Sequence, residues 1–415
     1  NTKAAAFLAT DAARTVLTRL YGRDEAVLTQ QRARYNALAQ RHVELFGEKD
    51  GLRFVSAPGR TEVAGNHTDH NHGKVLTAAI SVDTLAFVTK TDDNIVRINS
   101  EGYTPFEQNL DDLSFVESEA GDSKALVKGI AKYFVDNGFS VGGFAASVTS
   151  CVPAAAGVSS SASFELLIAE IFNVLYNDGA VTKMKKAQAS QYAENVYFLK
   201  PCGLMDQSAI SLGGVSMIDF ENVENPFVLS VQYPFTDTDI VITNTGGNHA
   251  DLTSDYAAIR AEMEEVSEKF SEKYLRLVDY QKFLDAIPAL QNEVSGRAIM
   301  RAIHFFDENL RVDKAVSAIN MKNADAFYKI VGESGDSSFK LLQNCYVPAD
   351  TVQRIPLGIV LSQHVTGVKA VRVHGGGFAG TIIAFVEKAE THEYVEHMSE
   401  VFGAEHVYKL SIRQE

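Results

Sequence analysis

Hydrophobic and polar positions along the chain follow two different periods, and these periods predict helices and strands in a mixed order. Apolar residues that recur every three or four positions predict amphipathic helices, and Gly22 and Gly47 are expected to stop the first two of them. We therefore expect two helices between residues 11 and 46, and others at 125–134, from about 160, at 186–199, between 201 and 213, and at 254–273, 298–318, 324–344 and 391–401.

Shorter apolar runs predict strands, several of which are bounded by glycine, proline or aspartate. The strand at 52–57 is expected to end at Pro58-Gly59, and the strands at 78–89 and 95–100 are expected to pair around Asp92-Asp93-Asn94. The glycine turn between the strands at 370–374 and 381–386 suits a bulge or a backbone that lies against a ligand. Other strands are expected at 144–151, 215–220, 227–232, 239–245 and 407–412.

The segment from Gly59 to Gly73 is too polar for a buried core and lies between apolar runs. It predicts either a solvated turn or a loop that carries a site. Three histidines and an aspartate also suggest a metal site, but four such residues packed into six loop positions seldom all face one ion. These four residues are His67, Asp69, His70 and His72.

The segment from Pro153 to Glu170 is a loop of small residues that leads into three serines and an amphipathic helix. Small side chains allow close approach of the backbone to a ligand, and a helix N-terminus favours an anion. Ser159 is expected to cap this helix with its hydroxyl. The loop lacks the Gly-Lys-Ser/Thr ending of a P-loop, so that motif is excluded. Taken alone, the segment suits either a phosphate site or a capped core helix after a tight turn.

The composition of the chain mainly excludes certain classes of binding partner. The chain has 415 residues, of which 46% are hydrophobic and 22% charged, as in globular enzymes and binding proteins. A net charge of −15 disfavours non-specific binding to nucleic acid or to anionic membranes. A local basic patch would still suffice to bind ATP.

Cysteine content and the absence of long apolar runs indicate where in the cell the protein is expected. The three cysteines have no CxxC spacing, so the sequence predicts neither a disulfide framework nor a zinc site and favours a cytoplasmic protein. The apolar stretch at the start is too short for a signal peptide, and no run is expected to span a membrane. The weakest connection between predicted elements lies at 221–226, so we place the domain boundary there and expect domains at 1–225 and 226–415.

Four blocks in a fixed order together resemble the GHMP kinase superfamily, and most closely its galactokinases. They are a signature segment, an ATP loop, a segment that holds the catalytic aspartate and a glycine-rich third motif, at Pro58–Gly73, Pro153–Ser163, Pro201–Gln207 and His374–Thr381. The resemblance implies an α+β protein of two domains with the active site in the cleft between them. The first domain would carry a helical N-terminal extension.

The resemblance also implies roles for single residues in an ATP-dependent sugar 1-kinase. Asp206 would accept the proton of the sugar hydroxyl, beside Arg60, which would stabilise the transferred phosphoryl group. The sugar would be bound by Asn66, His67, Thr68, Asp69, Gly203 and Tyr256. The phosphates of ATP would be wrapped by the backbone of Ala155, Ala156, Gly157, Val158, Ser159, Ser160 and Ser161. Ser161 and Glu194 would hold Mg²⁺.

Departures from the family pattern leave the sugar and the nucleotide affinity open. Asn66 stands where galactokinases have Glu, and Ala154-Ala155-Ala156 stands where the family has more glycine. The leading hypothesis is a galactokinase with a relaxed pocket for C6 of galactose. The alternatives are a kinase for a sugar that differs at C6, such as galacturonate, a regulator that senses sugar and ATP without turnover, and a kinase for mevalonate or homoserine. The His67-Thr68-Asp69 block disfavours this last alternative.

Overall fold

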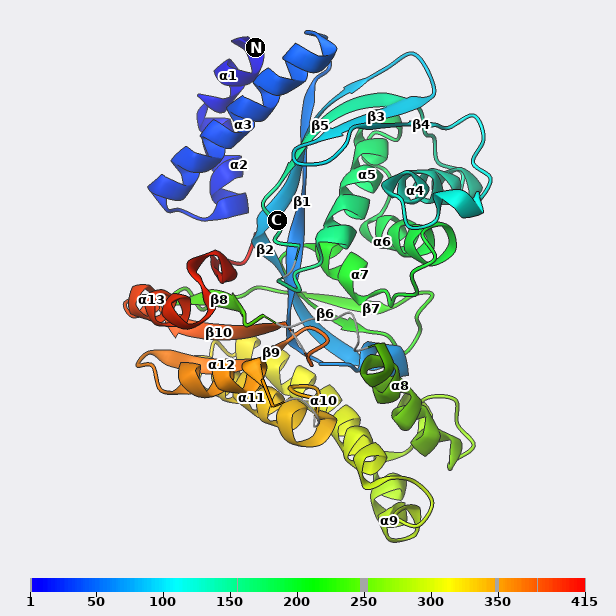
Figure 1. The fold of residues 1–415 in the computed structure, drawn as a ribbon, viewed down its shortest axis with the longest axis vertical. Coiled ribbons are helices and arrows are strands. Elements are labelled where there is room, and N and C mark those ends of the chain that lie inside the picture. The colour runs from blue at the N-terminus through cyan, green and yellow to red at the C-terminus, as the bar shows by residue number, and fades with distance from the viewer. Residues whose placement is uncertain (1, 155, 247–252, 348–350, 379, 415) are drawn as a thin grey trace.

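The fold consists of two β-sheets, each covered by helices, in a computed structural model that describes residues 2–154, 156–246, 253–347, 351–378 and 380–414. The larger sheet and its helices form the upper part of Figure 1, whereas the smaller sheet lies at the lower left and the helices of that part extend from there to the lower right. Two long strands of the larger sheet, β1 and β2, run down to the junction between the two parts. The predicted α+β architecture is confirmed.

The larger sheet has seven strands in the order β4-β3-β5-β2-β6-β7, with β1 paired to β2 outside this path. Its neighbours are antiparallel except β3 and β5, which are parallel. The strands are β1 (Arg53–Ala64), β2 (Lys74–Lys90), β3 (Ile95–Ser100), β4 (Phe106–Asn109), β5 (Phe144–Ser150), β6 (Val215–Asp219) and β7 (Phe227–Val231).

Two predictions about this sheet are wrong. Strand β3 does not pair with β2, because β5 lies between them. Strand β1 does not end at Pro58-Gly59 but continues to Ala64, with a register shift between Pro58 and Arg60. Proline has no N–H to give to the ladder, so it is tolerated at such an irregularity. The first part of the segment expected to be a polar loop, from Gly59 to Ala64, is therefore a buried strand.

Helices cover both faces of the larger sheet. Helices α2 and α3 pack on β2, with α3 also against β5, while α5 packs on β1 and β2 and is itself covered by α4 and α6. The apolar faces of α4 and α5 join the sheet in one core that includes Phe134, Phe144 and Phe172. The helices of this part are α1 (Thr2–Leu8), α2 (Asp11–Tyr21), α3 (Glu25–Phe46), α4 (Ser123–Asp136), α5 (Ser160–Tyr176), α6 (Lys183–Tyr192) and α7 (Met205–Leu212).

The smaller sheet has four antiparallel strands in the order β11-β8-β10-β9. They are β8 (Thr238–Asn244), β9 (Val368–His374), β10 (Thr381–Glu387) and β11 (Val407–Leu410). Helix α11 packs on β9, and helix α13 packs on β8. The helices of this part are α8 (Thr253–Glu268), α9 (Tyr280–Leu290), α10 (Gly296–Asn320), α11 (Ala324–Ser337), α12 (Arg354–Gln363) and α13 (Thr391–Phe402).

The chain changes sheet later than the sequence indicated. The expected boundary at 225/226 falls inside the hairpin of β6 and β7, which both belong to the larger sheet. The crossing to the smaller sheet lies between Val231 and Thr238. Strand β7 is largely exposed, so its apolar pattern gave little sign of which sheet it joins. Within the described ranges, every helix is too short or too polar to cross a lipid bilayer.

Candidate active site

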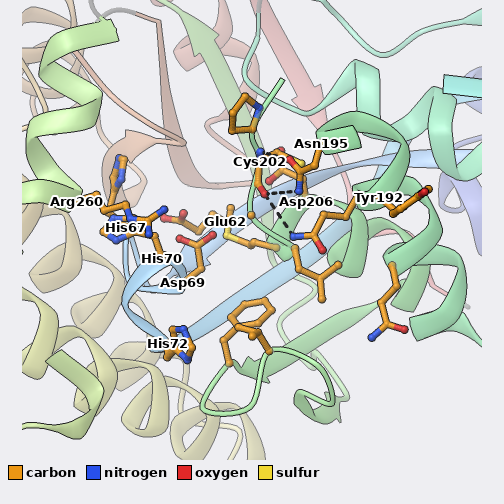
Figure 2. Close-up of a pocket in the computed structure, with 18 of the residues that line it drawn as sticks. Glu62, His67, Asp69, His70, His72, Tyr192, Asn195, Cys202, Asp206 and Arg260 are labelled. Carbon is orange, nitrogen blue, oxygen red and sulfur yellow. Dashed lines mark hydrogen bonds between the residues drawn. The ribbon is translucent and has the colours of Figure 1, made fainter. Parts of the chain in front are cut away.

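A cavity of about 1090 Å³ is lined by strand β1, the loop that follows it, helices α6 and α7, and the glycine turn between β9 and β10. Its size suits a small-molecule ligand. Figure 2 shows Glu62, His67, Asp69 and Asp206 close together in this cavity. Three of the four predicted motifs thus contribute to one wall, although they lie far apart in the sequence.

Asp206 and Arg60 form a two-point ion pair at the cavity. Nε and Nη2 of Arg60 donate to the two carboxylate oxygens of Asp206 at 2.8 and 2.9 Å. Burial raises the pKa of Asp206, but the charge and hydrogen bonds of Arg60 outweigh burial and leave the pKa below its usual value. Asp206 is therefore a carboxylate at neutral pH. The predicted proximity of the two residues is confirmed.

The small-residue loop lies directly against this ion pair. Nη1 of Arg60 donates to the carbonyl oxygen of Gly157 at 2.6 Å, and the backbone N–H of Arg60 donates to Val158. The hydroxyl of Ser159 donates to Asp206. A side chain on Gly59 would bring its Cβ within 2.9 Å of the Val158 carbonyl, so glycine allows this contact between strand and loop.

The prediction that the hydroxyl of Ser159 caps helix α5 is wrong. Ser159 holds the N-cap position, but its φ of 63° and ψ of 59° are left-handed, and its hydroxyl accepts no N–H of the helix. A side chain normally caps a helix from the extended region. The N–H groups of the first turn, which include those of Ser160 and Ser161, therefore have no side-chain cap and can bind an anion.

The other predicted loop residues differ in exposure. Gly157 and Ser161 are exposed, whereas Ala156 and Val158 are buried in the core, so they can serve a ligand only through their backbone. Gly157 has a φ of 63°, and a Cβ there would lie 2.9 Å from the hydroxyl of Thr381. The loop thus also touches the third motif. Ala155 lies outside the described residues.

Asn66 lines the cavity, but its amide is bonded to protein groups. Its Nδ2 donates to Oε1 of Glu62 at 3.0 Å and to the carbonyl of Gly375 at 2.8 Å. Its Oδ1 accepts from Asn344 at 2.8 Å and from Ser338 at 3.2 Å. An amide has two donors and two acceptor positions, so this side chain is saturated by protein partners. Asn66, which was predicted to contact the sugar, joins the two halves of the molecule through these bonds.

Two other predicted sugar-binding residues also contact backbone. The hydroxyl of Thr68 lies 2.9 Å from the carbonyl of Gly65 and 2.6 Å from that of Lys74, and Thr68 is buried, so it holds a turn instead of facing the cavity. The hydroxyl of Tyr256 donates to the carbonyl of Gly377 at 2.8 Å. Tyr256 is not among the residues that line the cavity, and its role in sugar binding stays a prediction.

His67 does line the cavity, with a fixed orientation. Its Nε2 donates to the carbonyl of Gly376 at 2.9 Å. Burial lowers its pKa, so the ring is neutral and Nδ1 is left as an acceptor. The Nδ1 atom is not among the enclosed atoms without a partner, so it remains accessible. A ligand here must bring a donor, as a hydroxyl does.

Asp69 lies in a negative environment. Burial, followed by the charges of Glu62 and Asp206, raises the pKa of Asp69 to about 6. A Cβ on Gly203 would lie 2.7 Å from Oδ2 of Asp69, so the glycine lets the segment before helix α7 approach this carboxylate. Both residues line the cavity, and their role in sugar binding stays a prediction.

Glu62, for which the sequence indicated no role, lines the same wall. It follows Arg60 by two positions on β1, so both side chains lie on the same face of the strand. Its Oε1 accepts from Nη2 of Arg372 at 2.8 Å. The spacing of two would have pointed to Glu62 if β1 had been extended past Pro58.

Glu194 lies in a group of buried carboxylates beside helix α5. Gln207 donates to Glu194 at 2.9 Å and to Glu165 at 3.2 Å, and Lys200 donates to Glu194 at 2.8 Å. Burial, followed by the charge of Glu194, raises the pKa of Glu165, and its Oε1 is enclosed without a partner. Glu165 lies one helical turn after Ser161, which places it on the same face.

This donor set fits a divalent cation. A buried carboxylate whose pKa is raised by burial and by the charge of a neighbouring carboxylate, and which has one unpaired oxygen, is a group that a cation would neutralise. Among the described residues, no three His, Cys, Asp or Glu side chains are arranged to hold a metal by themselves. Mg²⁺ commonly takes one or two protein oxygens and completes its shell with phosphate and water.

Comparisons with known proteins agree in pointing to one family. Residues 40–90 match the galactokinase galactose-binding signature, and residues 125–214 match the GHMP kinases N terminal domain. The galactokinase of Clostridium tetani is 30% identical over 379 residues, which cover 88% of this chain and 91% of that protein. The galactokinase of Homo sapiens is 30% identical over 380 residues, which cover 89% and 92%.

Solved structures show the same likeness. The crystal structure of Lactococcus lactis galactokinase complexed with galactose matches with a TM-score of 0.77 and 26% identity, over 91% of this chain and 98% of that one. The mevalonate kinase of Methanococcus jannaschii matches with a TM-score of 0.63 and 14% identity, over 88% and 99%, which is a likeness of fold.

Proposed function

Because this chain belongs to the galactokinase family and is a sugar 1-kinase, we propose that it transfers the γ-phosphoryl group of ATP to the anomeric hydroxyl of galactose. One observation carries the proposal. Asp206 opens to the cavity while it is bonded to Arg60 and to Ser159 of the small-residue loop. A base for a hydroxyl and a binding site for phosphate thus lie side by side.

The residues have complementary tasks in this reaction. Asp206 orients the anomeric hydroxyl and takes its proton late, when the oxygen bonds to phosphorus and the proton becomes acidic. Arg60 keeps Asp206 ionised and adds positive charge where the phosphoryl group passes. The uncapped N–H groups at the start of α5 bind the phosphates of ATP. His67 and Asp69 accept hydrogen bonds from other sugar hydroxyls.

Mg²⁺ belongs to this proposal as the partner of ATP. When bound, it would neutralise phosphate charge during the transfer. Glu194 and the hydroxyl of Ser161 would supply the protein's oxygens, and the enclosed carboxylate of Glu165 supports a cation nearby. Lys200 donates to Glu194 and keeps part of that negative charge balanced.

Neutral galactose is favoured over galacturonate by the charges of the cavity. Glu62, Asp69 and Asp206 are carboxyl groups of one wall, and Arg60 is already paired with Asp206. The raised pKa of Asp69 is a second sign of negative charge there. A sugar carboxylate placed on this wall would be repelled, whereas neutral hydroxyls would donate to it.

The test is the reaction itself with purified protein, ATP, Mg²⁺ and a panel of monosaccharides, measured by ADP release and by phosphorus NMR of the product. We expect galactose 1-phosphate, with little turnover of galacturonate. Asp206→Asn keeps the shape of the side chain and should lower kcat by about 10²–10⁴-fold while galactose binding is retained. Sugar and ATP binding without any turnover would instead favour a sensing regulator.

A further inference from the structure

Glu62 is a buried carboxylate with one oxygen committed and one oxygen open. Its Oε1 accepts from Arg372 at 2.8 Å and from Asn66 at 3.0 Å. Arg372 is itself fully buried and also donates to the carbonyl of Val63 at 2.9 Å. These contacts fix the carboxylate in place before any ligand arrives, as a rigid binding group requires.

The second oxygen, Oε2, is available to a ligand. It accepts no hydrogen bond from any residue in the described ranges, yet it is not among the enclosed atoms that lack a partner, so it keeps access to the cavity. In Figure 2, Glu62 lies between His67 and Asp206, near Asp69. A carboxylate oxygen held in a largely buried wall without a donor costs free energy, which a ligand hydroxyl would recover.

Position on the strand separates Glu62 from the reacting centre. Arg60 and Glu62 are two positions apart on one face of β1, which is about 6.6–6.8 Å along the strand. Arg60 holds Asp206, the proposed base. When the anomeric hydroxyl lies at Asp206, Glu62 faces a different part of the sugar.

The geometry points to Glu62 as a specificity-determining residue whose Oε2 accepts a hydrogen bond from a sugar hydroxyl other than the one that is phosphorylated. This inference rests on the proposed function. It assigns to Glu62 the task that sequence comparison gave to position 66, where Asn66 is saturated by its protein partners. Asn66 then acts as a positioning residue that holds Oε1 of Glu62.

The test combines one substitution with a set of sugars that each lack one hydroxyl. Binding of galactose and of its 2-, 3-, 4- and 6-deoxy forms is measured by calorimetry on the full chain and on Glu62→Gln. A hydrogen bond to a charged acceptor is worth enough that Glu62→Gln should weaken galactose binding about tenfold or more. For the deoxy sugar that lacks the contacted hydroxyl, the same substitution should change the dissociation constant less than about twofold.

A matched control separates direct binding from damage to the buried network. Glu308, on helix α10, is also a buried carboxylate, but both of its oxygens are bonded. They accept from the N–H of Gly65, from Ser334 and from Arg311. Glu308→Gln should affect all five sugars by a similar factor. If Glu62→Gln also acts uniformly, or does not weaken galactose binding, the inference is overturned.

A structure of the native protein with galactose avoids any dependence on the stability of the variant. A sugar hydroxyl within about 3.2 Å of Oε2 of Glu62 would support the inference, and no hydroxyl within about 3.5 Å would overturn it. If galactose binds and is phosphorylated but makes no contact with Glu62, only this inference fails. If the native protein neither binds nor phosphorylates galactose, the proposed function fails and the inference falls with it.

Discussion

Ser159 stands at the N-terminus of helix α5 but gives its hydroxyl to Asp206, at the start of helix α7. The contact connects the small-residue loop to the proposed base, and it leaves the first turn of α5 without a side-chain cap. One serine therefore orients a carboxylate and keeps an anion site open. Its left-handed backbone makes both possible, because it turns the hydroxyl away from the helix.

The role of Ser159 can be measured by its dependence on Asp206. We expect Ser159→Ala to lower the free energy of unfolding in the native background by about 1 kcal/mol, but by only a few tenths in the Asp206→Ala background. A serine that caps its own helix would cost about 1 kcal/mol in both backgrounds. Urea denaturation of the four proteins in this cycle distinguishes the two roles.

Arg60→Lys is expected to lower kcat by more than it raises KM. Lysine keeps the positive charge but cannot contact both oxygens of Asp206 and the carbonyl of Gly157 together, as the guanidinium does. Loss of an interaction made mainly in the transition state appears in kcat. Steady-state kinetics over a range of galactose and ATP concentrations separates the two parameters.

The control for Arg60→Lys is a basic residue of the cavity that lies outside the ion pair. Arg260 lines the cavity and pairs with Glu264 on its own helix. Arg260→Lys should leave kcat within about twofold of native, since that helix pair is exposed and weak. A change confined to KM in Arg60→Lys would show that Arg60 binds substrate without acting in the transition state.

Glu194→Gln is expected to raise the Mg²⁺ concentration needed for half-maximal activity. The glutamine side chain has only one acceptor oxygen, so it can keep the bond to Gln207 or the bond to Lys200 but not both. It also lacks the negative charge that a divalent cation requires. Calorimetry of Mg²⁺ and ATP binding to the variant provides a measurement independent of turnover. The matched variant Lys200→Gln leaves the carboxylate of Glu194 in place and should not raise the Mg²⁺ requirement. Equal Mg²⁺ dependence in native protein and Glu194→Gln would leave Glu194 a structural residue.

Much of the fold was accessible from the sequence because periodic apolar patterns report which face of an element is buried. Strands β5, β6, β9 and β10 and helices α2, α3 and α13 were predicted close to their observed bounds. In the part of the chain that the structure describes, the α-helices α1, α9 and α12 were not predicted. Sheet order was not accessible, because pairing of β3 with β5 instead of β2 is decided by contacts between distant segments.

The sequence indicated which charged residues lie together, but it did not indicate which polar residues are buried. Arg60 and Asp206 were assigned together, and the structure pairs them. Glu62 was passed over because a glutamate in a polar stretch suggests a loop, whereas here Arg372 compensates its burial inside a strand. Asn66 was assigned to the sugar because sequence alone does not show that four protein partners already saturate its amide.

Asp69 is expected to control the acid side of the pH profile. Its pKa is raised to about 6 by burial and by the charges of Glu62 and Asp206, so it loses its charge as pH falls through about 6. A protonated carboxyl is a weaker acceptor, so kcat/KM for galactose should fall below that pH. Glu62→Gln removes a neighbouring charge and should shift this limb to lower pH. If the acid limb of the kcat/KM profile lies at the same pH in Glu62→Gln as in the native protein, its assignment to Asp69 is contradicted.

The raised pKa of Asp69 also affects the stability of the fold, because the ionised carboxylate that is proposed to bind the sugar is unfavourable in the folded protein. Because the folded pKa of Asp69 lies above its unfolded value of about 3.9, the folded state binds the proton more tightly, and its ionised form costs on the order of 2–3 kcal/mol above pH 6. Asp69→Asn should therefore unfold at higher denaturant concentration than the native protein at pH 7.5, while it binds galactose more weakly. A loss of stability at pH 7.5 would contradict this account.

Asn66→Glu, which restores the residue of the family pattern, is expected to destabilise the protein without improving galactose binding. The amide of Asn66 donates to Glu62 and to the carbonyl of Gly375, and its side chain is fully buried. A glutamate would place a carboxylate against another carboxylate and a carbonyl. An unpaired buried charge costs about 3–5 kcal/mol, which urea denaturation would detect. Asn66→Asp is the control for size, because it keeps the shape and should also be destabilising. If Asn66→Glu is instead as stable as the native protein and changes the ratio of kcat/KM for galactose and 6-deoxygalactose, then position 66 faces the sugar and Glu62 does not replace it.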